Sequence, residues 1–176
     1  MQPEAKSEIG EASARPLAEL LSCPPPIASL LNASAQCIVF DTRDTIFQQG
    51  AECHGLYVVV SGQLLRKAER LEKRLTLGTT RVGDLVELAA TLGDGRHTYT
   101  LVAQSSGSLL MLPMNALAQA FHSYPPLRMR LLEELAREVS RAYVSCRATR
   151  LAGIRRHGFK SPLVASDLPL GPQSND

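Results

Sequence analysis

The feature that most constrains this fold is a series of short apolar or alternating segments, which extends from Cys37 to about Leu112. Turn-forming residues separate the segments at near-regular spacing, as in Ser61-Gly62 and Gly93-Asp94-Gly95. Many short strands at such spacing are typical of a β-sandwich or a jelly roll. The expected strands cover residues 37–40, 45–47, 56–60, 64–66, 74–77, 98–102 and 108–111.

Helical segments flank this β-rich region on both sides. The sequence predicts short helices near residues 17–21 and 27–35, which the prolines at 24–26 separate. A further short helix is expected over Met114–His122, and Pro125 fits the first turn of a long helix. The expected organisation is a disordered N-terminus over residues 1–14, a β-roll over 15–124, a long helix over 125–150 and a basic, Gly/Pro-punctuated tail over 151–176.

The long helix carries apolar residues at the three- and four-residue spacing of a coiled-coil seam. The repeat covers little more than two heptads, so it predicts a pairing surface between two chains rather than a stalk. Leu127 and Leu131 can pack on the β-roll, which leaves the heptad face for a partner; the alternative is that the heptad face itself packs on the roll. The seam residues are Leu132, Leu135, Val139, Ala142 and Cys146.

Composition argues against several classes of protein. The net charge is only +2 and Trp is absent, so we expect neither a strong field toward DNA or membranes nor a stacking surface for single-stranded nucleic acid. No apolar run is long enough to span a bilayer, and the polar N-terminus is unlike a signal peptide. The four cysteines are scattered without a CxxC pair, which favours a reduced, cytoplasmic protein.

Two stretches and the order of the elements carry a resemblance to a known family. Thr45–Ala51 resembles a strand-and-turn entry of the form I-F-x-x-G, and Leu56–Gly62 resembles a hairpin of the form L-Y-x-(V/I)-x-S-G. The layout is similar to the cyclic-nucleotide-binding domain, and most of all to the sensor half of the Crp/Fnr bacterial transcription regulators. The resemblance extends over roughly Leu17–Arg150. It implies a double-stranded β-helix, or jelly roll, with short N-terminal helices and a long C-terminal dimerisation helix.

The phosphate-binding cassette of that family resembles Val82–Leu92 in this chain. The family pattern is Gly-Asp, then two positions of which the second is Gly, then Glu and a short helix, with an Arg before the next strand. The resemblance implies that the helix N-terminus and the Arg hold the cyclic phosphate, and that the Glu accepts a hydrogen bond from the ribose hydroxyl. Gly83, Asp84 and Glu87 match this pattern.

Three positions depart from the pattern. Val86 stands where the family has Gly, His97 where it has Arg, and Tyr99 where it prefers a small residue. Neutral His lacks a charged hydrogen bond worth about 1.5–3 kcal/mol, so the sequence predicts that cyclic nucleotide binding is weak or lost. The alternative is an altered nucleotide site that uses Arg96 and Glu87. The expected effector pocket consists of Gly83, Asp84, Val86, Glu87, Leu88, Ala89, Arg96, His97 and Thr98.

Other cofactors and catalytic chemistries have little support in the sequence. His97 or His54 is a candidate haem ligand, although a lone His in a β-rich domain is more often structural. No His-x-His pair suits a jelly-roll metalloenzyme and no Gly-x-Ser-x-Gly suits a hydrolase, so neither a metal site nor enzyme activity is expected. The cysteines lie 14, 16 and 93 residues apart, unlike the closely spaced ligands of iron–sulfur sensors: Cys23, Cys37, Cys53 and Cys146.

These observations lead to one function hypothesis and two alternatives. The Crp/Fnr regulators carry a winged helix-turn-helix after the long helix, and only 25 residues follow Leu151 here. The sequence therefore predicts a stand-alone regulatory sensor that binds an unidentified small effector, forms a homodimer and signals through its long helix to a protein partner. The first alternative is a shortened DNA-binding transcription regulator, whose basic stretch over Val139–Ser166 meets nucleic acid. The second alternative is a haem-based gas sensor.

Overall fold

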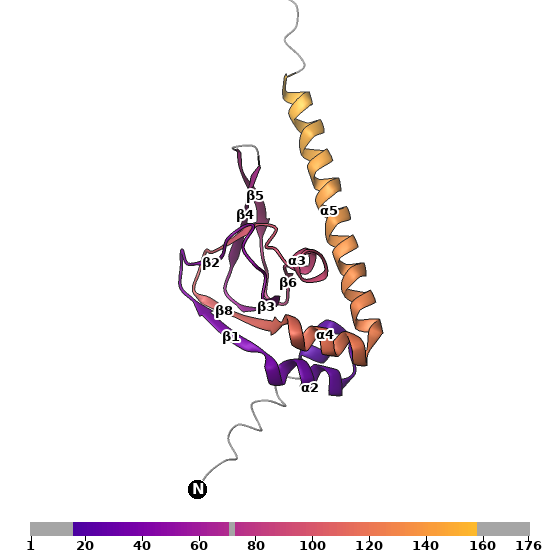
Figure 1. Cartoon of the computed structure of the whole chain (residues 1–176). Helices are drawn as coiled ribbons and strands as arrows, with labels where there is room; N and C mark the ends of the chain where they lie inside the picture. The colour runs from indigo at the N-terminus through magenta and orange to yellow at the C-terminus, as the bar shows by residue number, and fades with distance from the viewer. Residues whose placement is uncertain (1–15, 71–72, 158–176) are drawn as a thin grey trace, which may run out of the picture. The chain divides into compact units, whose positions relative to one another are not determined.

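The computed structural model of this chain describes residues 16–70 and 73–157 (Figure 1). The expected disordered N-terminus over residues 1–14, and residues 158–176 of the expected tail, lie outside the described residues. Contacts divide the chain into two units, Met1–Arg137 and Glu138–Asp176. The first unit contains the β-strands and the residues of the expected effector pocket.

Within the described residues, eight strands form two four-stranded sheets. The strands are β1 (Gln36–Phe40), β2 (Thr45–Phe47), β3 (Gly55–Ser61), β4 (Leu64–Arg70), β5 (Lys73–Thr79), β6 (Leu85–Val86), β7 (Thr100–Ala103) and β8 (Gly107–Pro113). The first sheet has the order β1-β8-β3-β6 and the second has the order β2-β7-β4-β5. Every neighbouring pair is antiparallel. This arrangement confirms the jelly-roll fold that the sequence predicts.

Strand β3 shows why the first sheet has a hydrophobic cluster on each face. Leu56 and Val58 belong to one cluster, whereas Tyr57 and Val59 belong to the other. Successive side chains of a strand point to opposite faces, so a continuous apolar run is buried on both sides. The cluster that also receives side chains of the second sheet is called the roll core. Its buried residues are Phe40, Phe47, Cys53, Tyr57, Val59, Leu64, Val86, Ala90, Tyr99, Leu101, Ala103, Leu109 and Met111.

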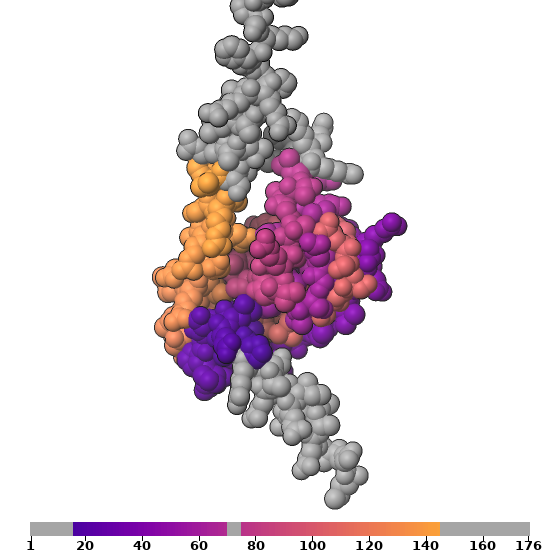
Figure 2. Space-filling view, turned by 180° about the vertical axis from the view of Figure 1, so that it is seen from behind, coloured from indigo at the N-terminus to yellow at the C-terminus, as the bar shows by residue number. Residues whose placement is uncertain are grey.

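Helices cover the other face of the first sheet and form the helix core with it. They are a short helix over residues 16–21, α2 (Pro25–Ser34), α4 (Met114–Ser123) and the beginning of α5 (Pro125–His157). Figure 2 shows the N-terminal helices, in indigo, against the start of α5, in orange. No helix in the described part of the chain is both long and apolar enough to cross a membrane. The buried residues of the helix core are Leu17, Leu21, Cys23, Ala28, Leu31, Leu56, Val58, Leu88, Leu112, Ala116, Leu117, Ala120, Leu127 and Leu131.

Gly62 forms the tight hairpin between β3 and β4. Its φ is +83°, in the left-handed region that an L side chain rarely adopts. A Cβ at this position would lie 2.7 Å from the carbonyl oxygen of Ser106, which is closer than real Cβ contacts allow. The positive φ that the hairpin motif predicts is confirmed, and the close approach of a neighbouring loop adds a second reason for glycine.

Three elements differ from the expectation drawn from the sequence. The two-residue strand β6 is not among the predicted strands. The strand expected over residues 98–102 begins at Thr100, because the Thr98 amide bonds to the Glu87 side chain instead of a neighbouring strand. Helix α5 continues to His157, although the sequence predicts a helix over 125–150 and a tail from 151. A single Gly such as Gly153 costs only about 1 kcal/mol inside a helix, so it does not stop one.

Candidate functional site

The cassette begins with a tight turn that its own residues close. Gly83 has a φ of +88°, and its N–H donates to the carbonyl oxygen of Val59 at 2.8 Å. The Asp84 carboxylate accepts from the N–H of Arg81 at 2.8 Å. The carbonyl oxygen of Asp84 accepts from the Val59 N–H at 3.1 Å. Gly83 and Asp84 therefore tie the cassette to β3, and the Asp84 carboxylate is engaged within the turn.

Glu87 follows β6 and is almost fully buried, with 2% of its surface exposed. It caps the N-terminus of α3 (Leu88–Leu92) with a φ of +70°, a backbone conformation that is strained for a residue other than glycine. Its carboxylate accepts hydrogen bonds from the Thr98 N–H at 3.2 and 3.3 Å and from the Thr98 hydroxyl at 3.2 Å. These bonds engage the oxygens that the family resemblance assigns to a ribose hydroxyl.

Val86 is a core residue rather than a pocket residue. Strand β6 pairs it with Tyr57, and its side chain is 1% exposed within the roll core. Burial of a Val side chain stabilises a fold by roughly 1.5–3 kcal/mol, which gives this position a packing role. Two further residues of the expected pocket flank the same segment: Leu88 belongs to the helix core, and Ala89 is half-buried.

His97 is buried, with 3% exposure, and stacks on Phe47 at a ring-centroid distance of 3.7 Å and an interplanar angle of 2°. Its Nδ1 lies 3.5 Å from Oε1 of Glu87 and has no hydrogen-bond partner among the described residues. Burial lowers the pKa of His97 to about 4, with a further contribution from the charge of His54. The imidazole is therefore neutral at pH 7 and supplies no positive charge for a phosphate.

Tyr57 and Tyr99 complete an aromatic cluster with Phe47 and His97. The ring centroids of Phe47 lie 5.3 Å from Tyr57 and 6.0 Å from Tyr99. Burial raises the pKa of Tyr57 to about 12, so its hydroxyl stays neutral. The side of Glu87 on which the resemblance places a charged Arg is thus occupied by neutral rings. Sequence reasoning did not place Phe47 and Tyr57 here, because they come from strands far earlier in the chain and only the sheet pairing brings them to His97.

Arg96 lies at the turn after β2 instead of at Glu87. Its guanidinium Nη1 donates to the carbonyl oxygen of Gly50 at 3.0 Å, and its backbone N–H donates to the Asp94 carboxylate at 3.1 Å. A backbone bridge to Glu52 holds the same residue. The structure therefore brings Glu87, His97 and Thr98 together but gives no support to a nucleotide site built on Arg96 and Glu87.

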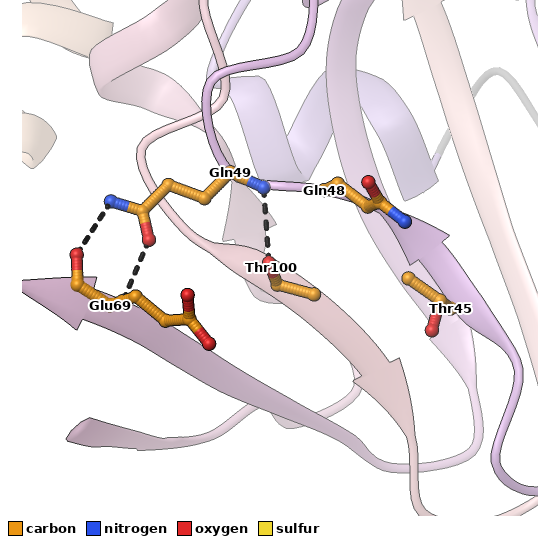
Figure 3. Close-up of a pocket in the computed structure, with 5 residues that line it drawn as sticks. All are labelled: Thr45, Gln48, Gln49, Glu69 and Thr100. Atoms are coloured by element: carbon orange, nitrogen blue, oxygen red, sulfur yellow. Dashed lines mark hydrogen bonds between the residues drawn. The ribbon is translucent and has the colours of Figure 1, made fainter. Parts of the chain in front are cut away.

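Two cavities lie away from the expected effector pocket, and neither is lined by any of its nine residues. The larger has a volume of about 430 Å³, beside β2, β4 and β7 (Figure 3). Its Gln49 side chain is engaged, since it accepts from the Glu69 N–H at 2.8 Å and donates to the Glu69 carbonyl at 3.4 Å. The smaller, of about 250 Å³, lies between α3, α4 and the beginning of α5. The larger cavity is lined by Thr45, Gln48, Gln49, Glu69 and Thr100.

The five residues of the expected seam on α5 have different environments. Leu132 is 37% exposed and Val139 is 59% exposed, as a pairing surface requires. Leu135 packs against the helix core, so it is occupied within its own chain. Ala142 is exposed, and the side chain of Cys146 lies outside the described part of the chain.

Two further residues of α5 extend the exposed apolar surface. Met129 is 58% exposed and Tyr143 is 63% exposed. With Leu132 and Val139 they define the exposed stripe of α5, at positions 129, 132, 139 and 143. With Ala136 this series has the alternating three- and four-residue spacing of a heptad seam, displaced from the predicted one. The same spacing was readable in the sequence, but it could not be preferred until the burial of Leu135 was known.

The candidate metal ligands remain apart. Among the described residues, no three His, Cys, Asp or Glu side chains lie close enough to hold a metal ion. Cys23 and Cys53 are buried and Cys37 is exposed, each as a free thiol. Burial raises the pKa of Cys23 and of Cys53, which disfavours the thiolates that ligate iron. His54, the second candidate haem ligand, is exposed.

A family comparison and similar folds agree with this geometry. The family model described as the cyclic nucleotide-binding domain matches residues 37–124, which is half of the chain. No curated protein matches the sequence.

Solved structures give the same fold at low sequence identity. The sensor domain of the transcriptional regulator DNR from Pseudomonas aeruginosa is 21% identical, with a TM-score of 0.62 over 73% of this chain and 91% of its own. The catabolite activator protein of Thermus thermophilus is 23% identical, with a TM-score of 0.63 over 72% of this chain and 60% of its own. A cyclic nucleotide-binding domain from Methylobacillus flagellatus is 15% identical, with a TM-score of 0.67 over 77% of this chain and 83% of its own.

Proposed function

Because this chain belongs to the cyclic nucleotide-binding domain family, we propose that it is a regulatory sensor of the Crp/Fnr type whose cassette no longer binds a cyclic nucleotide with high affinity. The likeness to the sensor domain of DNR and to a catabolite activator protein supports the Crp/Fnr type. In this proposal the domain binds another small effector and passes its state to a partner through α5.

The observation that carries the proposal is the neutral His97 beside the buried Glu87. In the family pattern a charged Arg bonds to the phosphate, whereas the pKa of His97 near 4 leaves this position uncharged at pH 7. Loss of a charged hydrogen bond costs about 1.5–3 kcal/mol of binding, which lowers affinity by more than about tenfold. Val86 adds a second obstacle, since its side chain belongs to the roll core and a ligand cannot displace it without opening that core.

Calorimetric titration of the full chain with cyclic AMP and cyclic GMP tests this proposal. We expect no binding below about 1 µM, where a preserved cassette would bind. His97→Arg should raise the affinity by about tenfold or more, because it restores a charged donor. Arg96→Gln is the matched control, since it removes a cation that lies at Gly50, and it should leave the weak binding unchanged. Sub-micromolar binding by the unmodified chain contradicts the proposal.

We also propose that two chains pair through the exposed stripe of α5. Its apolar side chains stay exposed in one chain and follow a heptad-like spacing, which favours a second copy as the partner. Sedimentation velocity should find a dimer. Val139→Glu places a charge in the stripe and should give a monomer, whereas Ser140→Glu places the same charge off the stripe and should not. A Val139→Glu protein that stays dimeric contradicts pairing at this surface.

A DNA-binding regulator is the second candidate function, and one observation favours it. From Val139 to Ser166 the chain has six Arg or Lys and no acid, and α5 carries the first five of these cations to His157. Such a stretch attracts the phosphates of a duplex. A gel shift at low and at moderate salt separates the candidates. Sequence-specific retention that survives moderate salt supports the regulator, whereas weak retention that salt abolishes supports the sensor without DNA binding.

A further inference from the structure

A groove between the cassette helix and the helices that follow β8 is a binding site separate from the cassette. It has a volume of about 250 Å³ and lies between α3, α4 and the beginning of α5. Its lining residues all belong to the first unit, Met1–Arg137. The apolar part of the lining consists mainly of Leu92, Met114, Leu117 and Phe121.

Arg128 is the single charged residue that lines this groove in the described structure. It is exposed, and no described residue forms an ion pair or a hydrogen bond with its guanidinium. The other polar side chain of the lining, Thr91, is engaged, since its hydroxyl donates to the carbonyl oxygen of Gly55 at 3.3 Å. An apolar cavity with one uncommitted cation favours a ligand that has an apolar body and one anionic group.

We propose that this groove binds a small amphiphilic carboxylate, with its chain among the apolar side chains and its carboxylate on Arg128. The size of the cavity limits the ligand. Each liquid water molecule takes up about 30 Å³, so a volume near 250 Å³ accommodates roughly eight to ten non-hydrogen atoms. A protein helix is about 10–12 Å across with its side chains and does not fit in such a space.

The position of the groove gives this ligand a route to regulation. Its lining joins α3, which follows Glu87 of the cassette, to α4 and to the first turn of α5. Leu88 of α3, Leu117 of α4 and Leu127 of α5 already share the helix core. A ligand that binds one arrangement of these helices better than another shifts the population toward it. The inference rests on the proposed function in one respect, because it identifies the effector class of a sensor whose cassette is closed.

Titration of the full chain with octanoate, followed by calorimetry, tests the site, and 1-octanol serves as its neutral counterpart. Octanoate should bind with a dissociation constant between about 10 µM and 1 mM, as expected for a ligand of this size. Octanol should bind about threefold to tenfold more weakly. Arg128→Gln should remove this difference by weakening octanoate alone, because the ion pair is exposed and contributes modestly. Arg130→Gln is the matched control on the same helix and should change neither affinity.

A steric variant separates the groove from other apolar surfaces. Ala118 lines the groove and is exposed, so Ala118→Leu should fill the cavity without disturbing the core and should abolish binding of both ligands. Gln119→Leu adds the same side chain at a neighbouring exposed position of α4 outside the groove lining and should leave binding intact. Absence of octanoate binding overturns the proposal, and so does binding that Ala118→Leu leaves unchanged. Equal affinities for octanoate and octanol overturn the carboxylate class.

The same titrations distinguish a failure of this inference from a failure of the proposed function. Tight binding of cyclic AMP contradicts the closed cassette and has no bearing on the variants at Arg128 and Ala118. Failure of octanoate to bind, together with weak cyclic nucleotide binding, rejects this ligand class and leaves the closed cassette standing.

Discussion

At the residue scale, the pair of Glu87 and His97 determines what the cassette can hold. Glu87 keeps an acid in the interior by accepting three contacts from Thr98, and its strained φ of +70° is held by the same bonds. His97 gains a stacking contact with Phe47 and loses hydration, which keeps it neutral. A charged anchor has been replaced by an aromatic contact, so packing occupies the place of electrostatic recognition.

This burial predicts a pH dependence of stability. The pKa of His97 is about 4 in the folded chain and about 6.5 when unfolded, so the unfolded chain binds more protons between these values. The free energy of unfolding should therefore rise with pH across this window and fall by roughly 3 kcal/mol as the pH drops from about 6.5 to 4. Urea unfolding at several pH values measures the slope.

His97→Phe is the control for this pH effect. It keeps an aromatic ring on Phe47 and removes the titrating group, so its slope should be shallower than that of the unmodified chain. Carboxylates contribute to both proteins and cancel in the comparison. Identical slopes would show that His97 does not titrate as its burial requires.

At the scale of elements, the turns fix the register of the strands they join. Gly62 and Gly50 both have a positive φ, at +83° and +81°, but their surroundings differ. A Cβ on Gly62 would contact the 106–107 backbone, whereas a Cβ on Gly50 would meet no atom within 4 Å. One position therefore combines backbone strain with a steric clash, and the other has the strain alone.

The two glycines form a matched pair of variants. Gly50→Ala should lower the free energy of unfolding by about 1–2 kcal/mol, the cost of a left-handed L residue. Gly62→Ala should lower it by more, because the hairpin and the 106–107 loop must also separate. Chemical denaturation measures both. An equal loss would mean that the loop yields freely at Gly62.

The strands and turns could be predicted from the sequence because their signals are local. Seven strand segments and the positive φ of Gly62 follow from alternation and turn chemistry. The role of Val86 could not be predicted, because its burial depends on the pairing of β6 with β3. The same applies to Leu135, whose heptad spacing suits a seam although the helix core occupies it. Contacts between distant segments decided each of these cases.

At the scale of the whole molecule, one sheet separates two hydrophobic clusters. The roll core holds the cassette residue Val86, and the helix core holds Leu88 two positions later. The cassette thus crosses from one cluster to the other at Glu87. Because the two clusters share the strands of the first sheet, loss of packing in either one weakens the same wall.

The burial of β3 on both faces has a consequence for the order in which the fold opens. β3 pairs with β8 on one edge and β6 on the other, whereas β5 is an outer strand with exposed Leu75 and Leu77. Amide hydrogen exchange followed by mass spectrometry should therefore find the central amides of β3 among the slowest, exchanging only with global unfolding. The β4–β5 hairpin should exchange through local opening, and equal protection of both would contradict this order. The most durable part of the molecule is then the wall between its two interiors, and the surfaces that meet other molecules are the parts that loosen first.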